Sequence, residues 1–309
     1  MSVILITGCS TGIGYAAAET LARNGHTVYA TMRNPDRSPQ LQSLADDNNL
    51  PITILPMDVL DDQSVETAIN KVLSKEGKID VLVNNAGIGS WGAVEELPME
   101  LFKADMETNY FGTLRCIKAV LPSMRKRKSG SIINVTSVAG KVFSNFHGAY
   151  CASKAAVEAL SESLAQELKP FNIQVAIVEP GVVETPIFNK VNTIPAGTSY
   201  PNIKRFLTIF SASLENHTPP SVVAEVINVI VPGESNSLRN PAGPDAAGLL
   251  QWRATTPDED WVNSGGISDD DWADGMEQMG LKVKKYLAAE GLPKFNTSKS
   301  EKLISEIVF

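Results

Sequence analysis

Tyr150 and Lys154 carry side chains that could transfer a proton, and they stand four residues apart in the run YCASK. Four residues of an α-helix turn through about 400°, so a helix here would bring both side chains to one face. A free tyrosine has a pKa of about 10 and is a weak base at neutral pH. A neighbouring ammonium favours the phenolate and lowers that pKa, so the pair could serve as general base and acid on an alcohol or a carbonyl.

Two further polar residues precede this pair. Ser137 follows a β-branched run, and its hydroxyl could hydrogen-bond a substrate oxygen and polarise it. Asn109 lies in METNYFGT, within a long helical pattern. Taken singly, each has a plainer explanation, since Y-x-x-x-K pairs are common, Ser137 could cap a strand end, and Asn109 could bend a helix. The four residues would form one catalytic set only if their order and the elements around them match a known pattern.

Rigid elements must position such a set, and the first 180 residues supply them as short apolar runs that alternate with helical patterns. The pattern predicts strands at residues 3–6, 26–31, 52–56, 81–83, 131–135 and 173–178. It predicts helices at residues 15–22, 101–124, 150–168 and 222–231. Near-continuous apolar strands between helices are typical of a parallel sheet covered on both faces. We therefore expect a single α/β domain with a Rossmann-like, doubly wound parallel sheet.

The first strand runs into the glycine-rich turn TGCSTGIG, with Gly8, Gly12 and Gly14 ahead of a helix. Glycines let a backbone approach a ligand closely, and a helix N-terminus offers unpaired N–H groups and the positive end of its dipole. The turn therefore suits a phosphate, with a tight strand-to-helix turn as the alternative. Its G-x-x-x-G-x-G spacing differs from the more common G-x-G-x-x-G dinucleotide fingerprint.

This spacing resembles that of the short-chain dehydrogenase/reductase family, and other motifs of the family follow in order. Asp58 and Val59 come after the third predicted strand, NNAG after the fourth, and PGVVET after the sixth. The resemblance spans about residues 2–245 and implies an NAD(P)-dependent oxidoreductase whose catalytic tetrad matches the four residues above, with Asn109 holding a water that links Lys154 to solvent. Asp58 could otherwise cap the next helix. The implied cofactor-binding residues are Gly8, Ser10, Thr11, Gly12, Ile13, Gly14, Arg33, Asp58, Val59, Asn85, Ala86, Gly87, Tyr150, Lys154, Pro180, Gly181, Val183 and Thr185.

The end of the second strand, VYATMRNP, bears on the choice of cofactor. NAD-dependent relatives commonly place an acid there for the ribose 2′-hydroxyl, whereas here Met32 takes that place and Arg33 follows. A guanidinium pairs well with a phosphate, so we predict that NADP(H) is preferred, with NAD(H) as the alternative. Thr11 departs from the pattern, because many NADP-preferring relatives carry a base just before the second glycine. A solvated Arg33 is the plainer explanation.

The runs TGCSTGIG, VYATMR, YCASK and LRNP resemble the hydroxysteroid and retinol dehydrogenase-like branch of the family, which handles bulky apolar alcohols and ketones. Residues 184–217 form the expected lid, and their apolar side chains would either bury such a substrate or pack the lid onto the body. We expect an apolar, steroid- or retinoid-like carbonyl or alcohol substrate, and we expect His147 to face its cleft. A cofactor-sensing binding protein and an isomerase or lyase that retains NAD(P) are the alternatives.

The net charge of −8 comes from one segment. Residues 254–281 hold eight acids and no Lys or Arg, while the other 281 residues hold 27 acids and 27 bases. We expect a catalytic domain over residues 1–246 and an acidic, Trp-containing extension over residues 247–309, with a short helix at 280–289. The extension could cap the substrate cleft, cover a subunit surface, or bind a cation or basic partner.

Composition also bears on partners and compartment. The charge balance argues against nucleic acid as a partner, and no apolar run is long enough to span a membrane. Three scattered cysteines, Cys9, Cys116 and Cys151, fit reduced thiols in the cytoplasm. We expect no metal site, and the family resemblance implies a homodimer or homotetramer.

Overall fold

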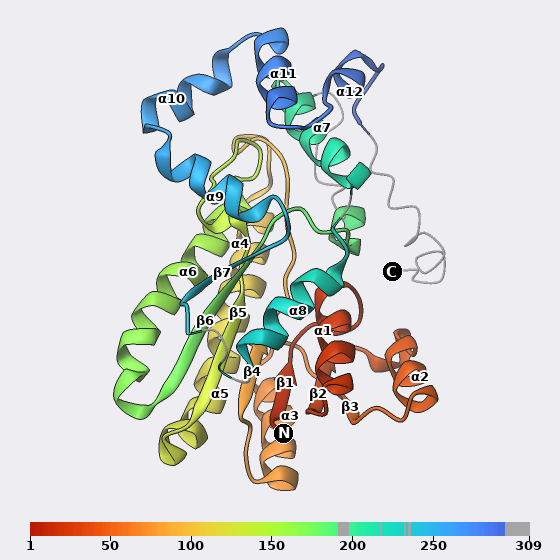
Figure 1. Cartoon of the computed structure of the whole chain (residues 1–309), viewed down its shortest axis with the longest axis vertical. Helices are drawn as coiled ribbons and strands as arrows, with labels where there is room; N and C mark the ends of the chain where they lie inside the picture. Colours follow the sequence, from red (N-terminus) through yellow and green to blue (C-terminus); the bar gives the residue numbers. More distant parts are fainter. Residues whose placement is uncertain (191–197, 217, 232, 234–235, 294–309) are drawn as a thin grey trace.

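A seven-stranded, wholly parallel sheet forms the centre of the protein (Figure 1). The computed structural model describes residues 1–190, 198–216, 218–231, 233 and 236–293. The strand order is β3-β2-β1-β4-β5-β6-β7. The order changes direction between β1 and β4, and such a switch point is where open α/β sheets bind ligands. The strands are β1 Val3–Ile6, β2 Thr27–Met32, β3 Ile52–Pro56, β4 Val81–Asn84, β5 Gly130–Val135, β6 Ile173–Pro180 and β7 Arg239–Ala242.

Helices cover both faces of the sheet, so the doubly wound prediction is confirmed. Helices α1 (Gly12–Arg23), α2 (Gln40–Asp47) and α8 (Pro220–Ile230) pack on one face, where Leu21, Leu41 and Ile227 are buried. Helices α3 (Asp62–Glu76), α5 (Gly112–Arg127) and α6 (Gly148–Leu168) cover the other. Alternate residues of each strand serve the two cores, since Ile4 faces the first and Leu5 the second.

Two predictions about these elements need correction. The helix predicted over residues 101–124 is three pieces: α4 (Met99–Asp105), a π-helical turn (Met106–Phe111) and α5. Apolar periodicity runs through all three, and a single wide turn barely disturbs it. The run LRNP was assigned no strand, yet β7 pairs with β6 there. Pro241 lacks an N–H donor, and an edge strand tolerates that loss.

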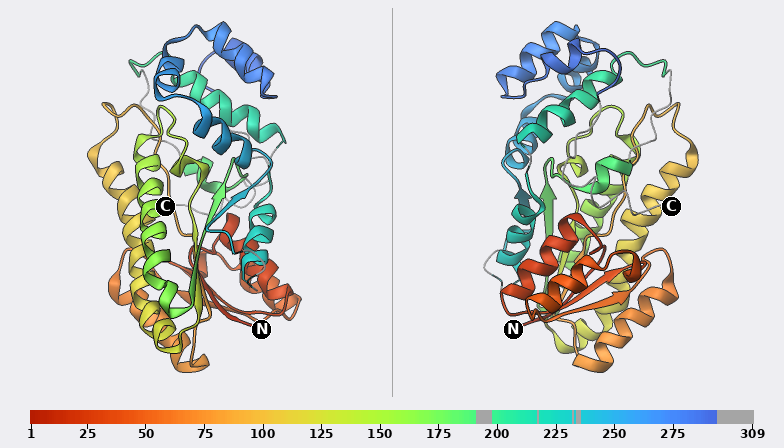
Figure 2. Two further views of the ribbon diagram at one scale, coloured as in Figure 1. Left: turned by 60° about the vertical axis from the view of Figure 1, so that its left-hand side comes forward. Right: turned by 90° about the vertical axis from the view of Figure 1, so that its right-hand side faces the viewer.

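A lid and a C-terminal arm lie beyond the carboxyl ends of the strands, as both views in Figure 2 show. Helix α7 (Ile203–Ser213) is the described core of the predicted lid, of which residues 191–197 and His217 lie outside the described residues. The arm comprises α9 (Ala246–Thr255), α10 (Asp258–Asn263), α11 (Asp269–Gln278) and α12 (Lys284–Ala288). Residues 294–309 of the predicted extension lie outside the described residues.

Helix α7 is held between the body and the arm. Phe206 and Leu207 pack in a cluster with Trp91 of the body, while Ala212 packs with Trp272 of the arm. Polar contacts add to this, because Lys204 Nζ donates to Leu287 O at 2.6 Å and Arg205 pairs with Asp269. The lid and the arm therefore form one packed layer. No helix among the described residues is long and apolar enough to cross a membrane.

Candidate active site

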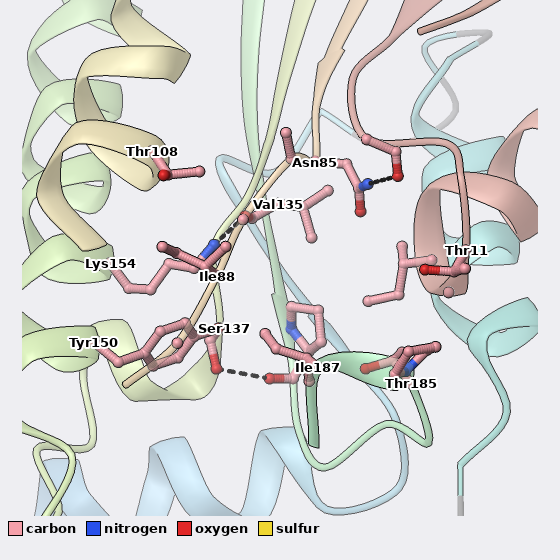
Figure 3. Close-up of a pocket in the computed structure, with 18 of the residues that line it drawn as sticks. Thr11, Asn85, Ile88, Thr108, Val135, Ser137, Tyr150, Lys154, Thr185 and Ile187 are labelled. Atoms are coloured by element: carbon pink, nitrogen blue, oxygen red, sulfur yellow. Dashed lines mark hydrogen bonds between the residues drawn. The ribbon is translucent and has the colours of Figure 1, made fainter. Parts of the chain in front are cut away.

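A cavity of about 460 Å³ opens at the carboxyl ends of the central strands (Figure 3). It brings together nearly every residue that the sequence singled out; Gly14 and Asn109 stand just behind its wall. The predicted residues that line it are Gly8, Ser10, Thr11, Gly12, Ile13, Arg33, Asp58, Val59, Asn85, Ala86, Gly87, Ser137, Tyr150, Lys154, Pro180, Gly181, Val183 and Thr185.

Tyr150 and Lys154 lie on one face at the start of α6, beside Ser137 (Figure 3). Lys154 Nζ donates to Val135 O at 3.0 Å and lies 5.6 Å from the centre of the Tyr150 ring. Ser137 Oγ accepts a hydrogen bond from Ala139 N at 3.1 Å and donates to Pro180 O at 3.4 Å. The serine thus caps a turn, as the plainer explanation held, and also faces the cavity.

The electrostatics of this group differ in one respect from the sequence expectation. Burial raises the pKa of Tyr150 above its ordinary value and outweighs a hydrogen bond with Ser137, which lowers it. Burial lowers the pKa of Lys154 to about 8, against the carboxylates of Asp105 and Glu158, which raise it. The phenol is therefore protonated at neutral pH in this structure, whereas the sequence predicted a lowered tyrosine pKa. A protonated phenol is the form that can donate a proton.

Asn109 lies on the π-helical turn and is 1% exposed. Its Oδ1 accepts a hydrogen bond from Ile88 N at 2.9 Å, and its Nδ2 donates to Ile88 O at 2.9 Å and to Ser153 Oγ at 2.8 Å. A Cβ on Gly87 would stand 3.2 Å from Asn109 Oδ1 and 3.5 Å from Lys154 Nζ. The amide is therefore close to the Lys154 ammonium but engaged with the cavity wall.

The glycine-rich turn joins β1 to α1 and borders the cavity. Gly8 and Gly12 have φ of +73° and +63°, which favour glycine. A Cβ on Gly14 would meet Gly8 O at 2.5 Å, so Gly14 allows close packing and does not line the cavity. Thr11 makes no side-chain cap and the first turn of α1 holds no acid. The first N–H groups of α1 are thus available to an anion, the requirement for binding a pyrophosphate.

The NNAG segment is tied to this turn. Thr7 Oγ1 accepts hydrogen bonds from Asn85 N and Ala86 N, each at 2.9 Å. Asn85 Nδ2 donates to Thr7 O at 2.9 Å and to Gly8 O at 3.2 Å. Because these bonds join the ends of β1 and β4, they fix both walls of the switch-point crevice.

Arg33 and Asp58 lie at the far end of the cavity from Tyr150. Met32 closes β2 and is buried, and Arg33 is exposed, with no hydrogen bond or ion pair within the described ranges. Asp58 Oδ1 accepts from Leu60 N at 3.0 Å. The helix-cap explanation for Asp58 is wrong, because Asp61 caps α3 through Gln63 N and Ser64 N.

Sequence reasoning missed Trp91, Ile88 and Val182 at the apolar end of the cavity, although it placed His147 and the apolar side chains of the lid there. Trp91 stacks on Phe210 at 4.6 Å, and its Nε1 donates to His147 Nε2 at 3.0 Å. The imidazole stacks on the Tyr150 ring at 4.7 Å, and burial lowers the pKa of His147 to about 3, so it is neutral. No local pattern marks Trp91, whose partner is 56 residues away. Other apolar lining residues are Ile88, Val182, Ile187 and Phe188.

No group of three or more His, Cys, Asp or Glu side chains in the described part of the chain could hold a metal ion. The side chains that line the cavity offer hydroxyl, phenol and ammonium groups beside the glycine-rich turn.

Comparisons with known proteins bear on this geometry. Residues 2–196 match the family model described as short chain dehydrogenase. A 3-ketodihydrosphingosine reductase from Bacteroides thetaiotaomicron is 37% identical over 246 residues, covering 78% of this chain and 88% of that protein. Retinol dehydrogenase 8 from Bos taurus is 36% identical over 268 residues, covering 82% and 85%.

Solved structures agree. A short-chain dehydrogenase from Streptomyces avermitilis has a TM-score of 0.73 at 31% identity and covers 90% of this chain and 97% of that chain. An alcohol dehydrogenase from the archaeon Thermococcus sibiricus, solved with 5-hydroxy-NADP, has a TM-score of 0.65 at 28% identity and covers 78% and 95%.

Proposed function

The chain belongs to the short-chain dehydrogenase/reductase family, and from this premise we propose that it uses NADP(H) to interconvert an alcohol and a carbonyl on an apolar substrate, with Tyr150 as general acid and base. One observation carries the proposal. A single cavity joins a phosphate-binding turn at one end to Ser137, Tyr150 and Lys154, and then to an aromatic wall that includes Trp91.

The residues present fit a dinucleotide. The uncapped first turn of α1 and the positive φ of Gly8 and Gly12 suit a pyrophosphate, and Asp58 would hold the adenine end. Residues 180–185, at the end of β6 and directly after it, would hold the nicotinamide carboxamide. When bound, the nicotinamide supplies or accepts a hydride.

The protein's own groups handle the proton. In the reductive direction, Tyr150 donates its phenolic proton to the substrate oxygen, and Ser137 hydrogen-bonds the same oxygen and stabilises its developing charge. Lys154, held by Val135 O, places a positive charge beside the ring and favours the phenolate that remains. In oxidation the proton returns by the same path. Asn109 is the proposed holder of a water that relays protons to Lys154.

NADP(H) is the proposed preference. Arg33 is an exposed guanidinium at the cavity edge, and the place of the acid common in NAD-dependent relatives is held by Met32. The solved relative with 5-hydroxy-NADP supports the same choice. NAD(H) remains the alternative to be tested against it.

The apolar wall supports a bulky apolar substrate. Trp91, Phe188, Phe206 and Phe210 pack around one another at the lid, with ring centres between 4.6 and 5.7 Å apart. Relatives named 3-ketodihydrosphingosine reductase and retinol dehydrogenase 8 support this class. A steroid- or retinoid-like ketone, aldehyde or alcohol fits the proposal.

An absorbance assay of NADPH oxidation against a panel of apolar ketones, apolar aldehydes and charged sugars tests the function. We expect turnover of apolar carbonyls by the wild type and a loss of at least about a thousandfold in Tyr150→Phe. Tyr286→Phe makes the same change on α12, outside the cavity, and should keep full activity. Activity that survives in Tyr150→Phe refutes the mechanism. NADPH bound but never consumed would favour a cofactor-sensing protein or a cofactor-retaining isomerase or lyase.

We further propose a cytoplasmic homodimer or homotetramer, with residues 1–246 as the catalytic unit and the arm as a cap over its lid. Ala159 on α6 is exposed and small, which suits close packing against a second subunit. Light scattering of the purified protein would give the subunit number.

A further inference from the structure

Asp105 is a buried carboxylate that the proposed mechanism does not use. It is the last residue of α4, directly before the π-helical turn, and none of its surface is exposed. Its Oδ2 accepts a hydrogen bond from Ser90 N and its Oδ1 accepts one from Ser90 Oγ, each at 3.1 Å. Both donors are uncharged. Burial of a carboxylate without a cation is unfavourable, so this charge calls for an explanation.

Ser90 belongs to the strip of residues 87–91, which follows β4 and forms one wall of the cavity. Ile88 is bonded through both its N–H and its carbonyl to Asn109. A Cβ on Gly89 would stand 3.2 Å from Cδ2 of Tyr150, so the backbone of the strip lies against the catalytic ring. The strip is therefore fixed on both sides of Gly89, by Asn109 at Ile88 and by Asp105 at Ser90.

Asp105 also acts on the catalytic pair through its charge. The carboxylate raises the pKa of Lys154, for which it is the largest influence opposing burial, and it contributes to the rise in the pKa of Tyr150. Burial raises the pKa of Asp105 itself to about 6, against its bonds to Ser90. At neutral pH the group is thus mainly ionised.

The remaining ionisable groups around the pair are few. On α6, Glu158 raises the pKa of Lys154 and Cys151 raises that of Tyr150. His147 is neutral, and Glu107 on the π-helical turn is paired with Arg115. Asp105 is therefore the main negative charge facing the pair from outside α6.

We propose that Asp105 is a positioning residue for the reaction, one that fixes residues 87–91 against the Tyr150 ring and holds the proton on Lys154. This rests on the proposed role of Tyr150 as the acid and base. The structural half stands on the two bonds to Ser90. The electrostatic half stands on the burial of both Asp105 and Lys154 along the same strip, where a Cβ on Gly87 would stand 3.5 Å from Lys154 Nζ.

The electrostatic half can be tested without a substrate. NMR of the full chain labelled with ¹³C-lysine gives the pKa of Lys154, assigned by its absence in Lys154→Met. Asp105→Asn keeps the shape and the acceptor for Ser90 N but removes the charge, and should lower the Lys154 pKa by roughly one pH unit. Asp62→Asn, the same change at a residue 81% exposed, should leave it unchanged. A Lys154 pKa in Asp105→Asn equal to that of the wild type overturns the electrostatic half of the proposal.

Kinetics test the link to catalysis. In alcohol oxidation, kcat/KM falls on the acid side as Tyr150 becomes protonated. On the acid side Lys154 keeps its proton in both proteins, so the loss of a nearby negative charge in Asp105→Asn should move this limb to lower pH. Ser90→Ala keeps the charge and removes one bond; it should lower kcat about tenfold with little change in the KM for cofactor and no shift of the limb.

These outcomes separate the two proposals. Full activity of Tyr150→Phe would overturn the proposed function, while the Lys154 titration would still report on Asp105. If Asp105→Asn does not fold, an unaltered kcat in Ser90→Ala overturns the positioning role. A drop in kcat with an unmoved limb and unmoved lysine pKa in Asp105→Asn would leave only a structural role and would overturn the electrostatic one.

Discussion

Replacing Glu179 by glutamine should make the folded protein more stable at alkaline pH. Glu179 lies near the end of β6 and is fully buried. Neither of its carboxylate oxygens has a hydrogen-bond partner in the described part of the chain. Its cation, Arg239, stands 3.7 Å away and is shared with Glu158 and Glu162, at 3.0 and 2.7 Å. The negative charge of an ionised Glu179 is therefore only weakly stabilised by hydrogen bonds or by a cation.

The pH dependence follows from its pKa. Burial raises the pKa of Glu179 from 4.5 to about 7, and the Glu158 carboxylate adds to the rise while Arg239 opposes it. Between these values the folded protein binds more protons than the unfolded chain, so this contribution is complete below pH 4.5 and is lost as the pH rises through 7. The loss amounts to about 3 kcal/mol. Glutamine resembles the neutral acid and keeps that free energy at all pH values.

Urea unfolding followed by circular dichroism at pH 5 and pH 8 measures the effect. Glu179→Gln should match the wild type at the lower pH and exceed it by about 3 kcal/mol at the higher, or by roughly 6 °C in Tm. Glu167→Gln, on the exposed face of α6, should show no such gain. A Glu179→Gln protein no more stable than the wild type at pH 8 would refute the reasoning.

Three further outcomes are expected. Arg33→Ala should raise the KM for NADPH at least about tenfold and leave that for NADH nearly unchanged, because only NADPH offers a 2′-phosphate; equal effects would exclude the assignment. Gly14→Ala should weaken NADPH binding, measured by its fluorescence, at least about tenfold, since the new Cβ meets Gly8 O at 2.5 Å, whereas Gly248→Ala meets nothing within 4 Å and is the control. Trp272→Ala removes a buried indole that packs against α7 and should destabilise the arm and lid by about 3–5 kcal/mol, seen as faster proteolysis there; an unchanged cleavage rate would contradict the packing.

Local pattern predicted the centre of this fold because the first six strands are short runs rich in β-branched residues, and most candidate site residues follow a strand end or open a helix. It failed where a partner decides the structure. The strand β7 contains a proline and no β-branched residue, and it exists because β6 leaves an edge to pair with. Trp91 and Asp105 look ordinary in sequence, and only the folding of the chain brings them to His147 and Ser90.

The acidic segment shows a different limit. The sequence placed a helix at 280–289, and the structure has a shorter one, α12, within that range. The acidic runs themselves are the first turns of α10 and α11, after Pro257 and Ser268. Acidic side chains at a helix N-terminus interact favourably with the positive end of the helix dipole. The sequence contained this helix-start signal, but the eight acids were interpreted together as a charged surface segment. The packing of the arm on α7 could not be predicted from local sequence, because it depends on contacts of Trp272 and Val283 with Ala212, which is far away along the chain.

Because of the π-helical turn Met106–Phe111, the site depends on the number of residues in this segment as well as on their types. A turn of this kind equals one extra residue inserted into a continuous helix, and removing it would turn all preceding residues by about 100° around the axis relative to those that follow. Asp105 and the buried face of α5 could then no longer both meet their partners. Substitutions within the turn that keep Asn109 should be tolerated more readily than the loss of any one residue, so a gap here in an aligned relative would mark a rebuilt active site.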